Sequence, residues 1–181
     1  MAATIQEAGI QPIGGLSQVR GDTGAALSQQ SIPAVLADTV ARFGERPAAL
    51  FREQGMRWTW REFAAVVDEL AAGLLGLGLE RGDRLGIWSP NRAEWLVTQF
   101  ATARIGVILV NINPAYRLSE LEYALNQSGV SLLVTAAAFK SSNYLGLLQN
   151  LGVGQPGGAS RLPALRSVVR MGDEATAGMR N

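Results

Sequence analysis

The amino-acid sequence predicts an α/β fold in which repeated βαβ units form a parallel sheet covered by helices. Short apolar runs alternate with amphipathic segments between residues 84 and 170. This alternation of strand-like and helix-like segments is typical of βαβ units, whose crossovers are right-handed. The runs are apolar on both faces, as in strands that helices cover from both sides.

The composition narrows the chemistry that this chain can perform. It contains no cysteine, which excludes disulfides and zinc–cysteine sites, and no histidine, which excludes Ser-His-Asp triads and histidine metal sites. The 16 basic and 15 acidic residues nearly cancel without visible blocks, so no nucleic-acid partner is predicted. No metal ligand and no catalytic residue is predicted within the chain.

The chain is predicted to have one folded domain after a flexible arm. Residues 1–30 are rich in Gly, Ala, Ser, Thr and Gln without sustained periodicity, which predicts a flexible N-terminal arm before a domain at 31–181. The N-terminus has no basic n-region or apolar core of an export signal, and no run is apolar enough to span a bilayer. We therefore expect a cytoplasmic protein without a transmembrane segment.

The first predicted elements are a helix and a pair of strands. Apolar residues recur at helical spacing between Ser31 and Gly44, and Pro33 favours the first helical turn. Residues 48–51 and 56–58 are predicted to be two short strands around a turn.

The next helix has recognisable signals at both ends. Thr59 and Glu62 have the spacing of a capping box, and Trp58 and Phe63 can form the hydrophobic staple. Gly78 is expected to end this helix as its C′ residue.

The repeated unit occupies the remaining chain. Predicted strands cover residues 84–88, 107–112, 131–135 and 165–170, and predicted helices cover residues 92–105, 121–127 and 143–151.

The stretch VNINPAYRLSELEY at residues 110–123 joins a strand to a helix. Asn113 and Pro114 break the apolar run and fix a turn. Ser119 and Glu122 have the spacing of a capping box for the helix that follows. A strand, a rigid turn and a capped helix often frame a ligand in α/β proteins, so this junction is a candidate for ligand contact.

Two further motifs have competing interpretations. Residues 152–157 read GVGQPG, a literal GxGxxG, but they follow a helix and include a proline, so a linker is predicted rather than a dinucleotide loop. Ser89-Pro90-Asn91 follows a predicted parallel strand. These residues are expected either to cap the next helix, which we favour, or to contact a ligand.

Several phrases occur together in a characteristic order. The phrases are ERPAALF at 45–51, WTWREF at 58–63, LGLERGDRLGIWSPNRAEWLVTQFATARIGVILVNINPAYR at 77–117 and SELEYALNQSGVSLLVT at 119–135. With these phrases the sequence resembles the N-terminal part of the AMP-forming acyl-CoA synthetases, a family of adenylate-forming ligases, and most of all the medium- and long-chain fatty-acyl-CoA ligases.

The resemblance implies an activity that needs more than these residues. The family activates a carboxylic acid with ATP and Mg²⁺ to an acyl-adenylate and transfers the acyl group to CoA. Its Ser/Thr/Gly-rich phosphate loop and catalytic lysine are not found in this sequence. We therefore expect a fragment truncated before the phosphate loop, inactive in isolation, and without tight binding of ATP, Mg²⁺ or CoA.

The resemblance also implies candidate cofactor-binding residues. In some members the corresponding junction lies near the CoA nucleotide, which places Asn113, Pro114, Ala115 and Tyr116 beside CoA. Lys140, in a basic position after the next strand, is then expected to reach a CoA phosphate as a point charge.

The sequence is also compatible with two other functions. One is a non-enzymatic module that binds an acyl group or CoA, or that pairs with a missing half. The other is an unrelated nucleotide-binding oxidoreductase, which the misplaced GxGxxG disfavours. A sheet cut partway also predicts self-association through its unpaired edge and uncovered apolar face.

Overall fold

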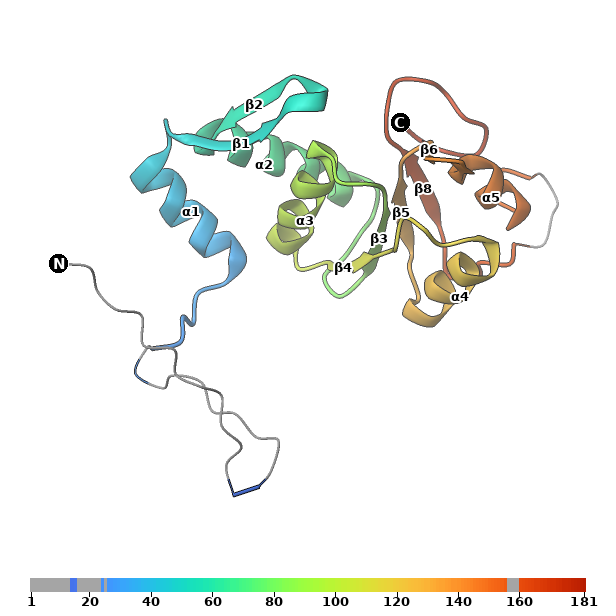
Figure 1. Ribbon diagram of the computed structural model, residues 1–181, viewed down its shortest axis with the longest axis horizontal. Helices are drawn as coiled ribbons and strands as arrows, with labels where there is room; N and C mark the ends of the chain where they lie inside the picture. The colour runs from blue at the N-terminus through green and yellow to red at the C-terminus, as the bar shows by residue number, and fades with distance from the viewer. Residues whose placement is uncertain (1–13, 16–23, 25, 156–159) are drawn as a thin grey trace. The chain divides into compact units, whose positions relative to one another are not determined.

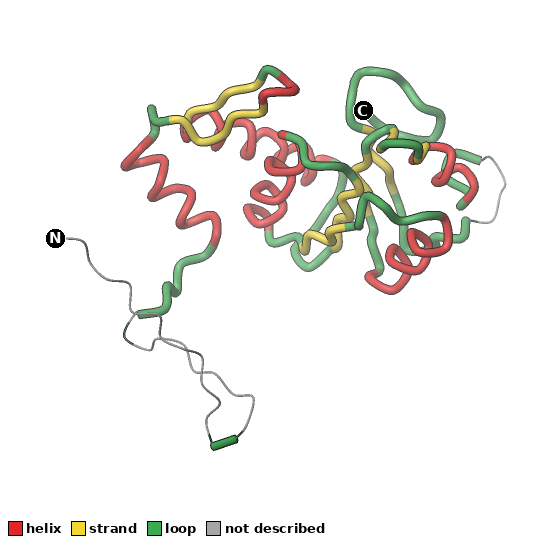
Figure 2. Tube along the Cα trace, viewed as in Figure 1, coloured by secondary structure: helices red, strands yellow, loops and turns green. Residues whose placement is uncertain are grey.

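The computed structural model describes residues 14–15, 24, 26–155 and 160–181. Contacts within the chain divide it into two units, Met1–Gln30 and Ser31–Asn181. All the helices and strands that are described lie in the second unit (Figures 1 and 2). The arm predicted over residues 1–30 lies largely outside the described residues.

Four parallel strands form the sheet that the sequence predicts. They are β3 (Arg84–Trp88), β4 (Ile108–Asn111), β5 (Leu132–Thr135) and β8 (Ser167–Arg170), in the order β4-β3-β5-β8. The chain passes from β3 to β4 on one side and then crosses to β5 on the other side of β3. This reversal is a topological switch point, where open α/β sheets bind ligands beyond the carboxyl ends of their strands.

One group of helices packs with the sheet in the first core cluster. This group comprises α1 (Ile32–Phe43), α2 (Trp60–Gly76) and α3 (Ala93–Ile105). Phe63 and Leu74 of α2 and Val97 of α3 are buried against Leu85, Ile87 and Val134 of the sheet. An antiparallel hairpin of β1 (Pro47–Phe51) and β2 (Met56–Thr59), joined by the 3₁₀ turn η1 (Arg52–Gln54), precedes α2.

A second core cluster involves α4 (Leu118–Ser128) and α5 (Tyr144–Asn150). Leu121 and Leu125 of α4 and Leu148 of α5 pack with Leu133 and Val168 of the sheet. Helices therefore cover the sheet from both sides, which explains why its strands are apolar on both faces. The sequence did not predict the short antiparallel hairpin of β6 (Ala138–Phe139) and β7 (Ser142–Asn143), which precedes α5.

The start of α2 confirms the predicted capping box. Thr59 Oγ1 accepts a hydrogen bond from Glu62 N at 3.2 Å, and Glu62 Oε2 accepts one from Thr59 N at 2.8 Å. The rings of Trp58 and Phe63 pack with centroids 6.1 Å apart, as expected of the hydrophobic staple. Gly78 has a φ of 81° and follows the last turn as predicted.

The predicted cap of α4 is wrong. The helix begins at Leu118, so Glu120 occupies its third position and accepts a hydrogen bond from Arg117 N at 2.8 Å. Ser119 lies inside the helix, and Glu122 instead accepts a hydrogen bond from Arg161 Nε at 2.8 Å. The pattern Ser-x-x-Glu fits the sequence, but the extended backbone at Arg117 starts the helix two residues earlier than that pattern requires.

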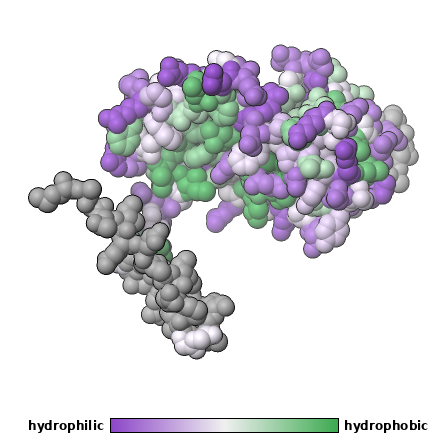
Figure 3. Space-filling model, in the orientation of Figure 1, coloured by the Kyte–Doolittle hydropathy of each residue, from purple (hydrophilic) through white to green (hydrophobic). Residues whose placement is uncertain are grey.

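The surface is unevenly hydrophobic. On the face seen in Figure 3, apolar residues gather over the part of the molecule that contains α1, α2 and α3. Val35 of α1 is 45% exposed and Leu75 of α2 is 53% exposed.

Candidate functional site

The candidate site lies at the carboxyl edge of the parallel sheet. The ladders pair Ile87 with Asn111 and Trp88 with Thr135, so β3, β4 and β5 end at the same edge. The segment that follows β4 therefore begins beside the end of β3. This is the edge at which the sequence predicts ligand contact.

Asn113 to Tyr116 form a compact turn at this edge. The carbonyl oxygen of Asn113 accepts a hydrogen bond from Tyr116 N at 3.0 Å, and Asn113 Oδ1 accepts one from Ala115 N at 2.9 Å. The side chains of Asn113 and Ala115 are exposed, whereas Pro114 and Tyr116 are half-buried. The turn is thus internally hydrogen-bonded and presents two of its residues to solvent.

Two buried aromatic side chains support this turn from inside. Trp88, the last residue of β3, and Tyr144, the first of α5, are both fully buried and stack with centroids 3.5 Å apart and an interplanar angle of 11°. Trp88 Nε1 donates to the carbonyl oxygen of Asn113 at 3.1 Å, and Tyr144 Oη donates to that of Pro114 at 2.6 Å. Burial raises the pKa of Tyr144 to about 12, so its hydroxyl keeps its proton and remains a donor well above neutral pH.

Sequence reasoning did not identify Trp88 or Tyr144 as site residues. Trp88 fits the end of an apolar strand, and Tyr144 fits the start of a helix. Neither local pattern signals a hydrogen bond to a turn 25 or 30 residues away.

Lys140 lies at the tip of the β6–β7 hairpin. Its side chain is exposed, its φ of 51° is left-handed, and its Nζ lies 5.3 Å from the centroid of the Phe139 ring. Arg117 Nη1 donates to Ser142 Oγ at 3.0 Å, which joins the end of the turn segment to this hairpin. The turn at residues 113–116 and the hairpin that carries Lys140 are therefore neighbouring elements.

Ser89-Pro90-Asn91 does not cap α3 as the sequence favoured. Ser89 is buried and donates to the carbonyl oxygen of Pro90 at 2.8 Å, and the N-cap residue of α3 is Arg92, without a side-chain cap. Gln54 Oε1, from the β1–β2 hairpin, accepts the hydrogen bond from Ala93 N at 2.8 Å instead. The helix is thus capped by a residue far away in sequence.

Glu94 completes the polar group at the start of α3. Its carboxylate accepts hydrogen bonds from Gln54 Nε2 at 2.9 Å and from Arg92 Nη2 at 2.6 Å. Burial acts to raise the pKa of Glu94, but these donors outweigh burial and hold the pKa below its ordinary value. The carboxylate is therefore a structural anion at neutral pH.

The GxGxxG segment does not open a helix. Gly152 and Gly154 follow α5 with φ values of 92° and 74°, and the end of the motif lies outside the described residues. A Cβ on Gly154 would lie 2.5 Å from the carbonyl oxygen of Ala177, so glycine is needed there for a close approach of two loops. This arrangement does not match a dinucleotide loop, whose glycines follow a strand.

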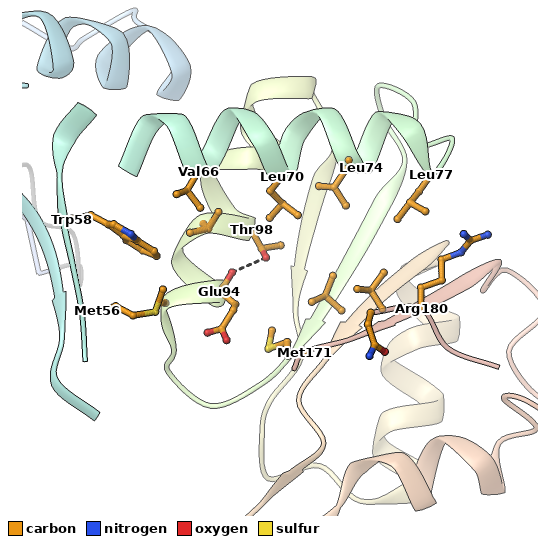
Figure 4. Close-up of a pocket in the computed structure, with 16 residues that line it drawn as sticks. Met56, Trp58, Val66, Leu70, Leu74, Leu77, Glu94, Thr98, Met171 and Arg180 are labelled. Carbon is orange, nitrogen blue, oxygen red and sulfur yellow. Dashed lines mark hydrogen bonds between the residues drawn. The ribbon is translucent and has the colours of Figure 1, made fainter. Parts of the chain in front are cut away.

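An apolar groove of about 590 Å³ lies between α2, α3 and the sheet (Figure 4). Val66, Leu70 and Leu74 line it from α2, together with Leu77, the C-cap residue of that helix, and they face Met171 and the sheet. Glu94, Thr98 and Arg180 are among its polar lining residues. It is a second candidate for ligand or partner contact.

The described residues show neither a metal-binding cluster nor a membrane-spanning helix. They contain no group of three or more His, Cys, Asp or Glu side chains placed to hold a metal ion. No helix within them combines the length and apolar character needed to cross a bilayer.

Solved structures with a similar fold include CoA ligases. An anthranilate CoA ligase, AuaEII, solved with anthranoyl-AMP, superposes with a TM-score of 0.72 at 21% identity, over 84% of this chain and 27% of that one. A long-chain-fatty-acid-CoA ligase from Archaeoglobus fulgidus gives a TM-score of 0.67 at 23% identity, over 86% and 29% of the two chains. At these identities the match establishes the fold.

Sequence comparison establishes the family. Residues 36–169 match the family described as AMP-binding enzyme. The chain is 43% identical over 159 residues to the mitochondrial medium-chain acyl-CoA ligase ACSF2 of Danio rerio, covering 84% of this chain and 26% of the relative. The human ACSF2 is 41% identical over 164 residues, covering 87% and 27%. The chain spans about a quarter of the length of these curated relatives. It belongs to the AMP-binding enzyme family, with acyl-CoA ligases among its relatives.

Proposed function

We propose that this chain is the N-terminal part of an acid–CoA ligase that activates a carboxylic acid, of the fatty-acid class, with ATP and transfers the acyl group to CoA. The observation that carries the proposal is the 43% identity to a medium-chain acyl-CoA ligase over 159 residues. The doubly wound sheet, with its edge at the switch point, supports a ligand-binding scaffold.

Within that ligase, we assign the turn Asn113-Pro114-Ala115-Tyr116 and Lys140 to the CoA site. The turn and the hairpin carrying Lys140 are joined through Arg117 and Ser142, and the ammonium group of Lys140 is exposed. A flexible exposed cation next to a rigid turn suits a phosphate-bearing ligand.

A substitution of Lys140 tests this assignment. In the complete ligase, Lys140→Ala is expected to raise the apparent KM for CoA by about three- to tenfold, because one charge-assisted contact to phosphate is lost. The ATP–pyrophosphate exchange that reports adenylation is expected to stay unchanged. Arg57→Ala, which removes an exposed cation from β2, is the matched control. An equal fall in adenylation with Lys140→Ala would contradict the assignment.

The 181 residues by themselves are expected to form no acyl-adenylate. Adenylyl transfer needs a cradle of backbone N–H groups, a cation on the phosphates and usually Mg²⁺. The sequence contains no phosphate-loop motif, and the described residues contain no cluster of carboxylates suited to a metal. We therefore expect no tight binding of ATP, Mg²⁺ or CoA by this chain alone.

ATP–pyrophosphate exchange tests directly whether this chain alone forms an acyl-adenylate. The purified chain, incubated with ATP, labelled pyrophosphate and fatty acids of increasing length, should give no exchange above a buffer control. A sample from the same host carrying an unrelated protein controls for contaminating ligases. Exchange that tracks the purified chain would show that it is catalytic alone.

The groove favours a second function, a non-enzymatic module that binds an acyl group or a partner. Its volume of about 590 Å³ falls in the range of small-molecule pockets. The coding sequence after residue 181 separates the two proposals. An open frame that encodes the phosphate loop supports the ligase, and a stop codon supports the module.

We also propose that the protein is located in the cytoplasm. The vertebrate relatives carry the word mitochondrial in their names, so a tagged protein followed by microscopy or fractionation is the suitable measurement.

A further inference from the structure

The stacked pair of Trp88 and Tyr144 connects the two parts of the candidate site. Trp88 ends β3 and Tyr144 begins α5, and both side chains are fully buried. Their rings lie 3.5 Å apart at 11°, so each restricts the rotation of the other. The two polar atoms of the pair, Trp88 Nε1 and Tyr144 Oη, both donate to the turn that contains Asn113 and Pro114.

These two donors hold consecutive carbonyl groups of the turn. Trp88 Nε1 lies 3.1 Å from the carbonyl oxygen of Asn113, and Tyr144 Oη lies 2.6 Å from that of Pro114. The same Asn113 carbonyl accepts from Tyr116 N. With both carbonyl groups directed inward, the path of the turn is fixed on its inner side, and the side chains of Asn113 and Ala115 remain exposed.

Tyr144 also holds the base of the hairpin that carries Lys140. Its backbone N–H donates to the carbonyl oxygen of Ala137 at 3.1 Å, directly before β6. The hairpin is joined to the turn segment at a second point by the hydrogen bond from Arg117 to Ser142. One residue therefore contacts both the turn and the hairpin.

We propose that Trp88 and Tyr144 are positioning residues for CoA, which set the relative placement of the Asn113–Tyr116 turn and the hairpin tip at Lys140. This proposal rests on the proposed CoA site. Neither side chain is placed in contact with CoA, because both are buried beneath the turn. Their effect on CoA arises through the backbone that they hold.

Two variants test the hydrogen bonds to the turn while an aromatic stack is retained. Tyr144→Phe and Trp88→Phe each keep an aromatic ring in the stack and remove one donor to the turn. Tyr123→Phe on α4 removes a hydroxyl from a residue that is 68% exposed and is the matched control. Each variant is made in the complete ligase and in the 181-residue chain.

In the complete ligase, both buried-ring variants are expected to raise the apparent KM for CoA by about three- to tenfold, because the turn loses one of the hydrogen bonds that fix its path. ATP–pyrophosphate exchange and Tyr123→Phe should show no change. In the 181-residue chain, hydrogen exchange measured by NMR should become faster at the amides of Ala115 and Tyr116 in both variants. This combination supports the proposal.

Three other outcomes would overturn it. If Lys140→Ala raises the KM for CoA and the two ring variants do not, the CoA site stands and the positioning role is wrong. If amide exchange speeds up but neither Lys140→Ala nor the ring variants change that KM, the CoA site itself is wrong. If adenylation and thioester formation fall equally at unchanged KM, the pair only stabilises the fold.

Discussion

At the scale of single residues, Gln54 shows how one side chain can join two distant elements. Its amide oxygen accepts from Ala93 N at 2.8 Å, and its amide nitrogen donates to Glu94 at 2.9 Å. The first turn of a helix leaves N–H groups without intrahelical partners, and α3 has no cap from its own N-cap residue. Gln54 supplies that missing partner from the β1–β2 hairpin.

Replacement of Gln54 is expected to destabilise the domain. Gln54→Ala should lower the free energy of unfolding by about 1–2 kcal/mol, because a helix cap and a hydrogen bond to a charged group are lost together. Urea denaturation followed by circular dichroism measures the change. The neighbouring exposed residue provides the control Glu53→Ala, which should change stability by less than about 0.5 kcal/mol. Equal stability of the two variants would show that the cap is dispensable.

At the scale of elements, α2 has a cap that depends on pH. The hydrogen bond from the backbone N–H of Thr59, and then that from its hydroxyl, lower the pKa of Glu62 below its ordinary value of 4.5. A carboxylate whose pKa is lower in the folded state stabilises the fold above its unfolded pKa. That contribution is lost as the pH falls through the lower, folded-state pKa.

A neutral variant isolates this effect. Glu62→Gln should unfold at a lower urea concentration than the unmodified chain at pH 7, and the difference between the two should shrink as the pH falls below 4.5. Glu69→Gln, on the same helix, corrects for the general loss of negative charge. A difference that stays constant from pH 7 to pH 3 would mean that the Glu62 carboxylate does not act through its ionisation.

At the scale of the whole domain, the groove leaves apolar surface exposed to water. Leu77 lines it and is 36% exposed, and Leu75, in the last turn of α2, is 53% exposed but does not line it. Exposed apolar grooves of this size favour association. We therefore propose that the isolated 181-residue chain self-associates through this groove.

Sedimentation equilibrium over a range of concentrations measures that association. The average mass of the chain should rise with concentration, and Leu77→Glu should reduce the rise because a charge enters the contact. Leu75→Glu places the same charge near the same helix end outside the groove and should have little effect. A mass that stays at 19.2 kDa at all concentrations would contradict self-association.

The amino-acid sequence by itself determined the order and type of most elements. Apolar spacing along the chain predicted the four parallel strands and the helices between them, and Thr59, Glu62 and Gly78 marked the ends of α2. These features depend on residues that lie close together along the chain, so a linear pattern records them. The family was also readable from phrases distributed over residues 45–135.

Only the tertiary structure decided which distant side chains meet. The sheet order β4-β3-β5-β8 brings the end of β3 beside the segment after β4, and so lets Trp88 and Tyr144 reach Asn113 and Pro114. The same holds for Gln54, which caps a helix 39 residues away and displaces the cap predicted at Ser89-Pro90-Asn91. These contacts leave no local period in the sequence, because they depend on the packing of whole elements around a shared core.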